Sequence, residues 1–139
     1  MEELAGALAA EEAAIYAYGL VGVHLDEDEQ GRARTAEQVH RERRDELVDQ
    51  LDELKASTAP APAGYQLPFE VTDRDTALKL AIHIEDGVGQ AWRVVLPVTE
   101  GTQRTDALSA LTDSAVRATR WRRIAGAEPL TMAFPGRAV

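Results

Sequence analysis

The chain has 139 residues, of which 45% are apolar, and it has a formal net charge of −9 and no cysteine. Its length is typical of one domain, residues 1–139, and its few aromatic residues among many Ala and Leu favour helices over sheet. The acidic charge disfavours nucleic acid and anionic membranes as partners. The lack of cysteine excludes disulfides and thiolate metal sites. The absence of a signal-like start or a long apolar span predicts a cytoplasmic protein.

The first predicted helix covers residues 2–24. At about 100° per residue, Leu4 and Ile15 mark its buried stripe, and Glu11 lies beside that stripe. The acidic residues 25–31 interrupt the pattern, so we interpret them as a solvated turn. A link this short makes the first two helices antiparallel neighbours.

The second predicted helix, residues 33–56, carries polar side chains where a helical core is expected. Its stripe contains Ala36, His40, Leu47, Leu51 and Leu54, with Glu37 at the edge and Arg43 and Arg44 on either side. Buried charge is costly unless it is paired, so other helices must supply carboxylates to this face.

Residues 57–72 contain several prolines and cannot be helical through their middle. Their apolar side chains are unsuited to a solvated linker. At about 3.1 Å per residue in an extended chain the segment reaches roughly 50 Å, whereas a helix of 24 residues is about 36 Å long. We therefore expect a crossover that runs the full length of the bundle and covers its core.

Residues 73–96 and 103–125 form the third and fourth predicted helices, and the short turn between them makes them antiparallel neighbours. Thr72 or Asp73 is expected to cap the third helix. Glu85 lies about 60° from the centre of its buried stripe, and His83 points almost the opposite way.

The fourth helix offers few polar groups to the core. Its predicted inner stripe contains Ala107, Leu111, Ala115 and Ala118, whereas Asp113 lies about 160° from the stripe centre. The arginines of its last turns suit the negative end of the helix dipole, and Gly126 suits a left-handed cap. The apolar residues after Gly126 predict an extended strap against the bundle.

Four sequence blocks resemble the bacterial ferritin-like domain family of unknown function. They are AAEEAAIYAYGLVG (9–22), VHRERRDEL (39–47), GYQLPFEVTD (64–73) and RWRRIAGAEPLTMAFPG (120–136). Two helical hairpins joined by a long crossover also give the ferritin-like four-helix-bundle topology. The resemblance implies this fold, in the ferritin-like superfamily, and almost no biochemistry.

A ferritin-like di-iron centre takes a Glu from each of two helices and a Glu-x-x-His from each of the other two. Glu11 and Glu85 fit the single carboxylates, and Glu37 with His40 has the Glu-x-x-His form, but the fourth helix supplies no ligand. Arginines directed at the same core repel divalent metals and compete for the carboxylates. We therefore expect a non-catalytic protein with a buried Glu/His/Arg ion-pair network and no cofactor.

Two other interpretations stay open. One is a metal-binding protein or metal-dependent oxidoreductase with a degenerate di-metal carboxylate site formed by Glu11, Glu37, His40 and Glu85. The other is a pocket for an unknown small ligand, lined by Glu11, Tyr16, His40, Arg44 and Glu85. We also expect a homodimer, because the small residues Gly19 and Gly22 allow another helix to approach closely.

Overall fold

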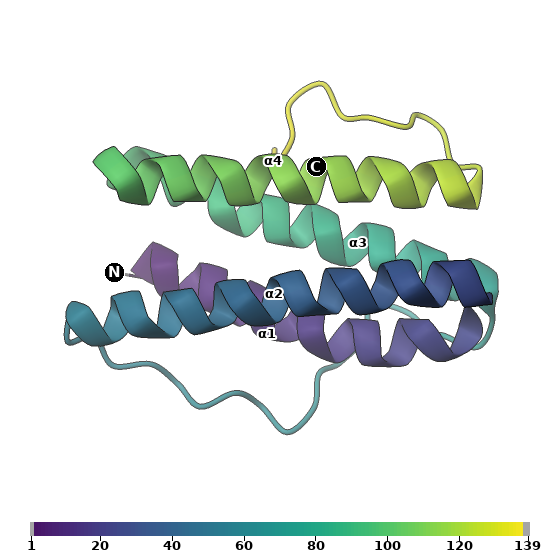
Figure 1. Ribbon diagram of the computed structural model, residues 1–139, viewed down its shortest axis with the longest axis horizontal. Helices are drawn as coiled ribbons and strands as arrows, with labels where there is room; N and C mark the ends of the chain where they lie inside the picture. The colour runs from purple at the N-terminus through teal and green to yellow at the C-terminus, as the bar shows by residue number, and fades with distance from the viewer. Residues whose placement is uncertain (1, 138–139) are drawn as a thin grey trace.

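The structure is a computed structural model that describes residues 2–137, and no strand occurs among them. It contains four long helices: α1 (Glu2–Val21), α2 (Glu27–Glu53), α3 (Arg74–Arg93) and α4 (Gly101–Ala125). Two short 3-10 helices follow α1 and α3, namely η1 (Gly22–His24) and η2 (Leu96–Val98). The all-helical class and the four predicted helices are confirmed (Figure 1).

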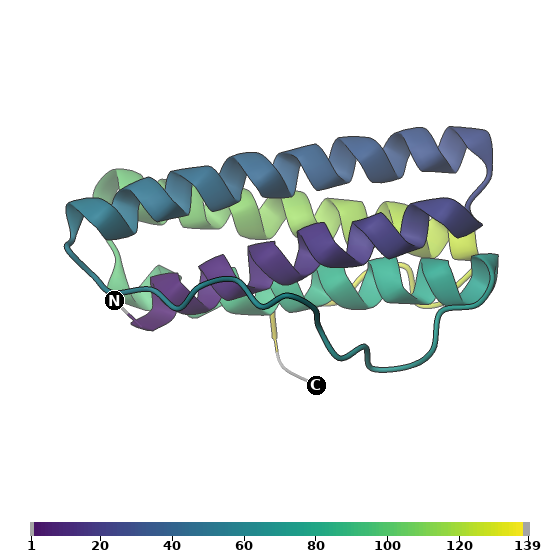
Figure 2. The ribbon, with the colours of Figure 1, turned by 90° about the horizontal axis from the view of Figure 1, so that it is seen from below.

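The helices form two antiparallel hairpins, α1 with α2 and α3 with α4, and the hairpins meet through α1 and α3. The backbones of α2 and α4 do not pack against each other in the same way. Figure 2 shows the crossover after α2 running back along the outside of the bundle to the start of α3. Any link between α2 and α4 must therefore come from side chains.

The acidic residues 25–31 do not form the solvated turn that the sequence predicts, because most of them belong to α2. Asp26 caps the helix: its side chain accepts from the Glu29 backbone N–H at 2.9 Å, and the Glu29 side chain accepts from the Asp26 N–H at 3.2 Å. This reciprocal capping box, with acids at the positive helix end, starts α2 at Glu27 rather than at residue 33.

Glu29 also connects α2 to the beginning of α3. Its buried carboxylate accepts two hydrogen bonds from Arg74, at 2.9 Å from Nε and 2.5 Å from Nη2. These bonds hold the pKa of Glu29 below its ordinary value. Asp73 caps α3 as expected, so the crossover is fixed at its far end by a cap and an ion pair.

The crossover covers the bundle as predicted. Leu67, Phe69 and Val71 are partly buried against one apolar cluster, and the rings of Tyr65 and Tyr16 lie 5.1 Å apart. The apolar side chains that distinguish this segment from a flexible linker therefore make tertiary contacts.

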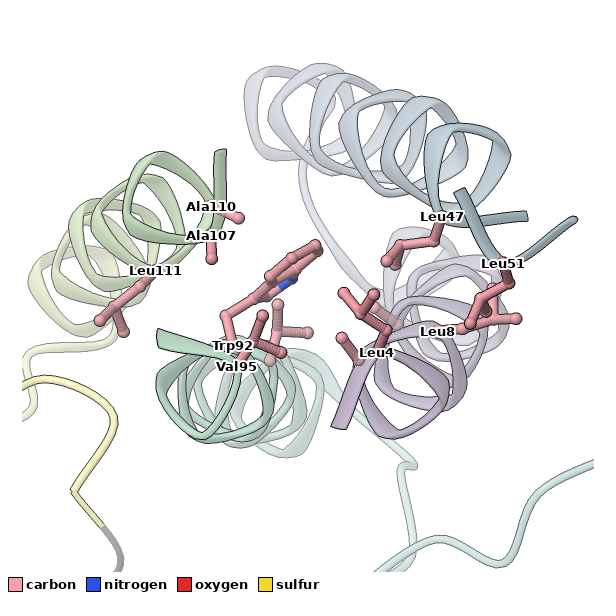
Figure 3. Close-up of a cluster of buried hydrophobic side chains, with 12 residues drawn as sticks. Leu4, Leu8, Leu47, Leu51, Trp92, Val95, Ala107, Ala110 and Leu111 are labelled. Atoms are coloured by element: carbon pink, nitrogen blue, oxygen red, sulfur yellow. The ribbon is translucent and has the colours of Figure 1, made fainter. Parts of the chain in front are cut away.

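The bundle core consists of two apolar clusters, one toward each end. Figure 3 shows the first, where Trp92 lies between the helices near Leu4, Leu47 and Ala110. The second contains Ala17, Tyr18, Val21, Leu25, Ala33, Ala36, Ala77, Leu78, Leu80, Ala81 and Trp121. Polar side chains occupy the middle of the bundle between these clusters. Two details of the predicted stripes are wrong, because Leu54 is 47% exposed and Ile15 is only partly buried.

Within the described residues, one stretch, Glu2–His24, is long and apolar enough to pass a composition test for a membrane span. The same composition is expected of a helix buried in a bundle, and 44% of the tested window is buried here. This stretch also places the charged side chain of Glu11 inside the bundle at 0% exposure.

The capping box predicts a measurable contribution to stability. Asp26→Ala removes the acceptor for the Glu29 N–H and should lower the free energy of unfolding by about 1 kcal/mol. Urea titration followed by circular dichroism measures this loss. Asp28→Ala is the control, because Asp28 is an exposed acid in the same turn without a capping bond, and its effect should stay within about 0.5 kcal/mol. Equal losses in both variants would contradict a specific role for Asp26.

Candidate functional site

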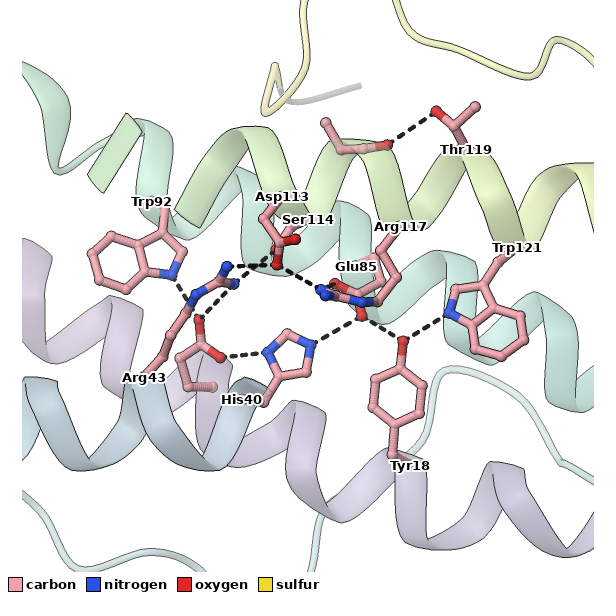
Figure 4. Close-up of polar contacts among 12 residues, drawn as sticks. Tyr18, His40, Arg43, Glu85, Trp92, Asp113, Ser114, Arg117, Thr119 and Trp121 are labelled. Atoms are coloured by element: carbon pink, nitrogen blue, oxygen red, sulfur yellow. Dashed lines mark hydrogen bonds and ion pairs between the residues drawn. The ribbon is translucent and has the colours of Figure 1, made fainter. Parts of the chain in front are cut away.

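A row of hydrogen-bonded side chains runs lengthwise through the middle of the bundle, from Trp92 to Trp121 (Figure 4). At its centre, the His40 ring of α2 lies between Glu11 of α1 and Glu85 of α3. His40 Nδ1 is 2.5 Å from Glu11 Oε2, and His40 Nε2 is 2.9 Å from Glu85 Oε2. All three residues are 0% exposed. One imidazole therefore joins three helices through two carboxylates.

The position of His40 determines its protonation state. Burial lowers its pKa, but the hydrogen bonds and charges of Glu11 and Glu85 outweigh burial and raise the pKa to about 9. With a carboxylate at each ring nitrogen, an imidazolium donates both hydrogen bonds, whereas a neutral ring leaves one nitrogen lone pair facing an oxygen. At neutral pH, His40 is a buried cation.

Each of the two carboxylates also accepts a hydrogen bond from an aromatic side chain. Trp92 Nε1 donates to Glu11 Oε1 at 2.7 Å, and the Tyr18 hydroxyl donates to Glu85 Oε2. Trp121 Nε1 in turn donates to the Tyr18 hydroxyl at 2.9 Å. Burial first, and then the charge of Glu85, raise the pKa of Tyr18 well above its ordinary value, so the phenol keeps its proton.

Two arginines connect this row to α4. Arg43 Nη2 lies 2.6 Å and Arg117 Nη1 lies 2.9 Å from Asp113 Oδ2. The same guanidinium groups approach the inner carboxylates at longer range, with 3.8 Å from Arg43 to Glu11 and 3.6 Å from Arg117 to Glu85. Although burial opposes it, the charges of Arg117 and Arg43 hold the pKa of Asp113 below its ordinary value. Arg43 and Asp113 therefore bridge the gap between α2 and α4.

Six ionised side chains lie in or beside this row, and their charges balance. We call this group the polar layer. Glu11, Glu85 and Asp113 are negative, and His40, Arg43 and Arg117 are positive. Removing a charge from water costs several kcal/mol unless an opposite charge and hydrogen bonds replace the water. The bundle tolerates a charged centre because the layer is neutral as a whole.

The structure brings together Glu11, His40, Arg43 and Glu85 as the sequence predicts. The other three candidates lie outside the polar layer, and for them the predicted convergence is wrong. Glu37 faces outward and pairs with Arg41 at 3.3 Å, Arg44 pairs with Asp45 at 3.0 Å, and Tyr16 packs on Tyr65. Adjacent residues on a helix point about 100° apart, so Arg43 and Arg44 cannot both enter the core.

Sequence reasoning missed five members of the layer or its hydrogen-bonded boundary. They are Tyr18, Trp92, Asp113, Arg117 and Trp121. Three residues of the predicted inner stripe of α4, Ala107, Leu111 and Ala118, are buried, but the buried face also includes Ser114 and is rotated from the predicted centre toward Asp113 and Arg117. One sequence signal could have identified Asp113 and Arg117 as a pair, because they are opposite charges at i and i+4 and face the same way.

The inner carboxylates are buried and paired with cations, although Glu85 Oε1 accepts no hydrogen bond and lies 3.6 Å from Arg117 Nη1. No group of three or more His, Cys, Asp or Glu side chains arranged to hold a metal ion occurs in the described part of the chain. The five side chains predicted to line a small-ligand pocket do not converge, because Tyr16 and Arg44 face elsewhere and the other three fill the core. The geometry therefore favours an ion-pair network over the metal alternative.

Comparisons with known proteins relate the chain to a protein family. Residues 3–139 match the model described as Domain of unknown function (DUF4439). Among solved structures, the chain is similar to the crystal structure of a conserved hypothetical protein, rv2844, from Mycobacterium tuberculosis. The two share 41% identity and a TM-score of 0.86, over 96% of this chain and 95% of that chain. No curated protein matches the chain.

The raised pKa of His40 predicts that stability depends on pH. A group whose pKa rises from 6.5 to about 9 on folding contributes fully below pH 6.5, and its contribution is lost as pH rises through 9. The free energy of unfolding should fall by roughly 3 kcal/mol between pH 6 and pH 9.5. Urea titrations across this range measure the loss. His83→Gln, at an exposed position, should keep the slope, and a flat profile in the wild type would contradict a buried imidazolium.

The adjacent arginines of α2 provide a matched pair of variants. Arg43→Ala removes one of the three cations of the layer and the bridge from Glu11 to Asp113, and it should cost roughly 2 kcal/mol of unfolding free energy, less than a fully buried pair because Asp113 reaches solvent. Arg44→Ala removes only a surface contact and should cost no more than about 0.5 kcal/mol. Thermal or urea melts of the two proteins decide the point, and a larger loss for Arg44→Ala would reverse the assignment.

Proposed function

Because the chain belongs to the DUF4439 family, a domain family of unknown function, we propose that it is a ferritin-like bundle in which ion pairs among its own side chains stand in place of a di-metal centre. It acts as a non-catalytic module, through binding or assembly. The observation that supports this proposal is the arrangement of the polar layer, which has ferritin-like spacing on all four helices but cationic side chains at its centre.

The two single carboxylates of a ferritin-like cage come from two different helices. Here Glu11 on α1 and Glu85 on α3 project into the middle of the bundle from one helix of each hairpin. Each carboxylate meets a ring nitrogen of His40 and one aromatic donor. Three of the four carboxylate oxygens accept hydrogen bonds from these donors, and the fourth, Glu85 Oε1, lies 3.6 Å from Arg117 Nη1.

The other two helices of such a cage each carry a Glu-x-x-His pair. On α2 the pair at this spacing is His40 and Arg43, one turn later than the predicted Glu37 and His40. On α4 the pair is Ser114 and Arg117. Both histidine positions thus hold an arginine, and guanidinium groups repel divalent cations.

The metal-dependent alternative is less well supported by this geometry. A divalent ion at the centre would have to displace the imidazolium and lie near two fixed guanidinium groups. The charge balance would then be lost, because the cations already neutralise the carboxylates. On this account, the described side chains in the middle of the bundle do not form a metal centre for a redox reaction.

Metal analysis tests the proposal directly. Protein purified without chelators should contain far less than one Fe or Mn per chain, and EDTA should leave its melting temperature unchanged. A reconstruction provides the positive control. Combining His40→Glu, Arg43→His, Ser114→Glu and Arg117→His restores four carboxylates and two imidazoles at ferritin-like spacing, and this variant should bind Co²⁺ with tetrahedral or five-coordinate visible absorption. Near-stoichiometric metal and EDTA-sensitive melting in the wild type would overturn the proposal.

The homodimer predicted from the sequence stays a proposal, as does the cytoplasmic location. A Cβ added at Gly19 or Gly22 meets nothing within 4 Å, so no contact within the protomer requires glycine at either position. Val23 beside them is 75% exposed. This open face supports a close approach by a second copy, where small residues would matter.

A further inference from the structure

The segment after α4 is anchored at both ends and arched between them. Its first anchor is Gly126, which ends α4 in the left-handed conformation at φ 69°. At the second anchor, Arg93 Nη1 donates to the Pro135 carbonyl at 3.0 Å, and Gly136 sits against the bundle. Figure 1 shows this strap, residues 127–137, leaving α4, running back alongside it and returning to the bundle near its middle.

The second anchor requires glycine. Gly136 has φ +79°, and a Cβ built on it would lie 2.8 Å from the Gly89 carbonyl oxygen and 2.9 Å from the Arg93 Cβ. Both the backbone angle and the close approach exclude a side chain here. The strap is thus held at a fixed place on α3.

Between its anchors the strap partly covers a pocket of about 460 Å³ against α3 and α4. This volume lies within the range of small-molecule sites, roughly 300–1,000 Å³. Most of the wall is apolar, formed by Leu108, Leu111 and Val116 of α4 and by Met132 and Pro135 of the strap. Leu108 and Val116 are 52% and 43% exposed, so the strap leaves apolar surface uncovered. An apolar molecule would bury this surface.

One wall of the pocket carries an ion pair that can orient a ligand. Arg122 of α4 and Asp86 of α3 both line it, and Arg122 Nη2 donates to Asp86 Oδ2. The Arg122 side chain is only 14% exposed, which strengthens its hydrogen bonds. A guanidinium has five N–H donors, and the contact with Asp86 uses one nitrogen, so donors remain for an anionic group.

We propose that this strap pocket binds a small amphipathic carboxylate. The apolar body lies between the strap and the α4 side chains Leu108, Leu111 and Val116, and the carboxylate accepts hydrogen bonds from Arg122. The pocket borders the polar layer, because Glu85 also lines it, but the buried Glu85 carboxylate is paired with His40. The proposal does not depend on the proposed loss of a metal centre. It requires only the strap, the apolar wall and the Arg122 guanidinium.

Binding is measured with 8-anilinonaphthalene-1-sulfonate, which has an apolar body and one anionic group. Its fluorescence should rise with saturation at one site per chain. Decanoate should displace it, and decyltrimethylammonium, with the same chain length and the opposite charge, should be at least about tenfold weaker. Arg122→Gln should lower the affinity for decanoate about tenfold.

Two variants locate the site. Thr112→Trp adds a large ring at an exposed position of the pocket wall and should abolish decanoate-displaceable fluorescence. Thr102→Trp is the matched control, because Thr102 is exposed on the same helix and does not line this pocket. Gly136→Ala should displace the strap and weaken binding while the bundle stays helical, since the strap lies outside the core clusters.

Three results would overturn the proposal. The first is that the wild type shows no saturable binding. The second is that decyltrimethylammonium displaces the probe as well as decanoate does. The third is that Thr112→Trp binds as tightly as Thr102→Trp. Circular dichroism of each variant confirms that its helices are intact. If Thr112→Trp does not fold, the comparison of Gly136→Ala with the wild type decides the location.

Discussion

The double hydrogen bond of the His40 imidazolium to Glu11 and Glu85 is the interaction on which the rest of the structure depends. It fixes the rotation of three helices at once, because each ring nitrogen must meet a carboxylate from a different helix. An apolar core can slide or repack at moderate cost, but a charged group inside it has very few acceptable positions. The centre of this bundle is therefore set by electrostatics, and the apolar clusters on either side pack around it.

The fourth helix joins this arrangement through different contacts. The helix packs along α3, and the pairing of Arg117 with Glu85 adds an ionic contact between these two helices. Since α2 and α4 do not pack through their backbones, the bridge from Arg43 to Asp113 links α4 to α2. The Trp92 and Trp121 indoles donate at opposite ends of the row, and each also belongs to one of the apolar clusters. A layer with its charges paired and an aromatic ring at each end is suited to holding the four helices together. The strap pocket offers more scope for function because it opens to solvent.

Much of the fold was accessible from local sequence signals. Prolines located the crossover, its apolar residues distinguished it from a linker, and Gly126 located the end of α4. The sequence alone misplaces the start of α2, because its acidic run has the composition of a solvated loop, whereas in the structure Asp26 and Glu29 form a capping box and Glu29 is buried under Arg74. Solvation and capping use the same residue types, and the difference lies in the contact with a residue 45 positions away.

The sequence by itself determined the helices, their order, and the presence of His40, Glu11 and Glu85 near the core, because helical periodicity places each residue around the axis of its own helix. It did not determine how each helix is rotated against its neighbours. That rotation decided that Arg43 enters the core and Arg44 does not, and that α4 turns Asp113 and Arg117 toward the layer. Only tertiary packing sets it, since the favourable rotation is the one that pairs buried charges contributed by all four helices.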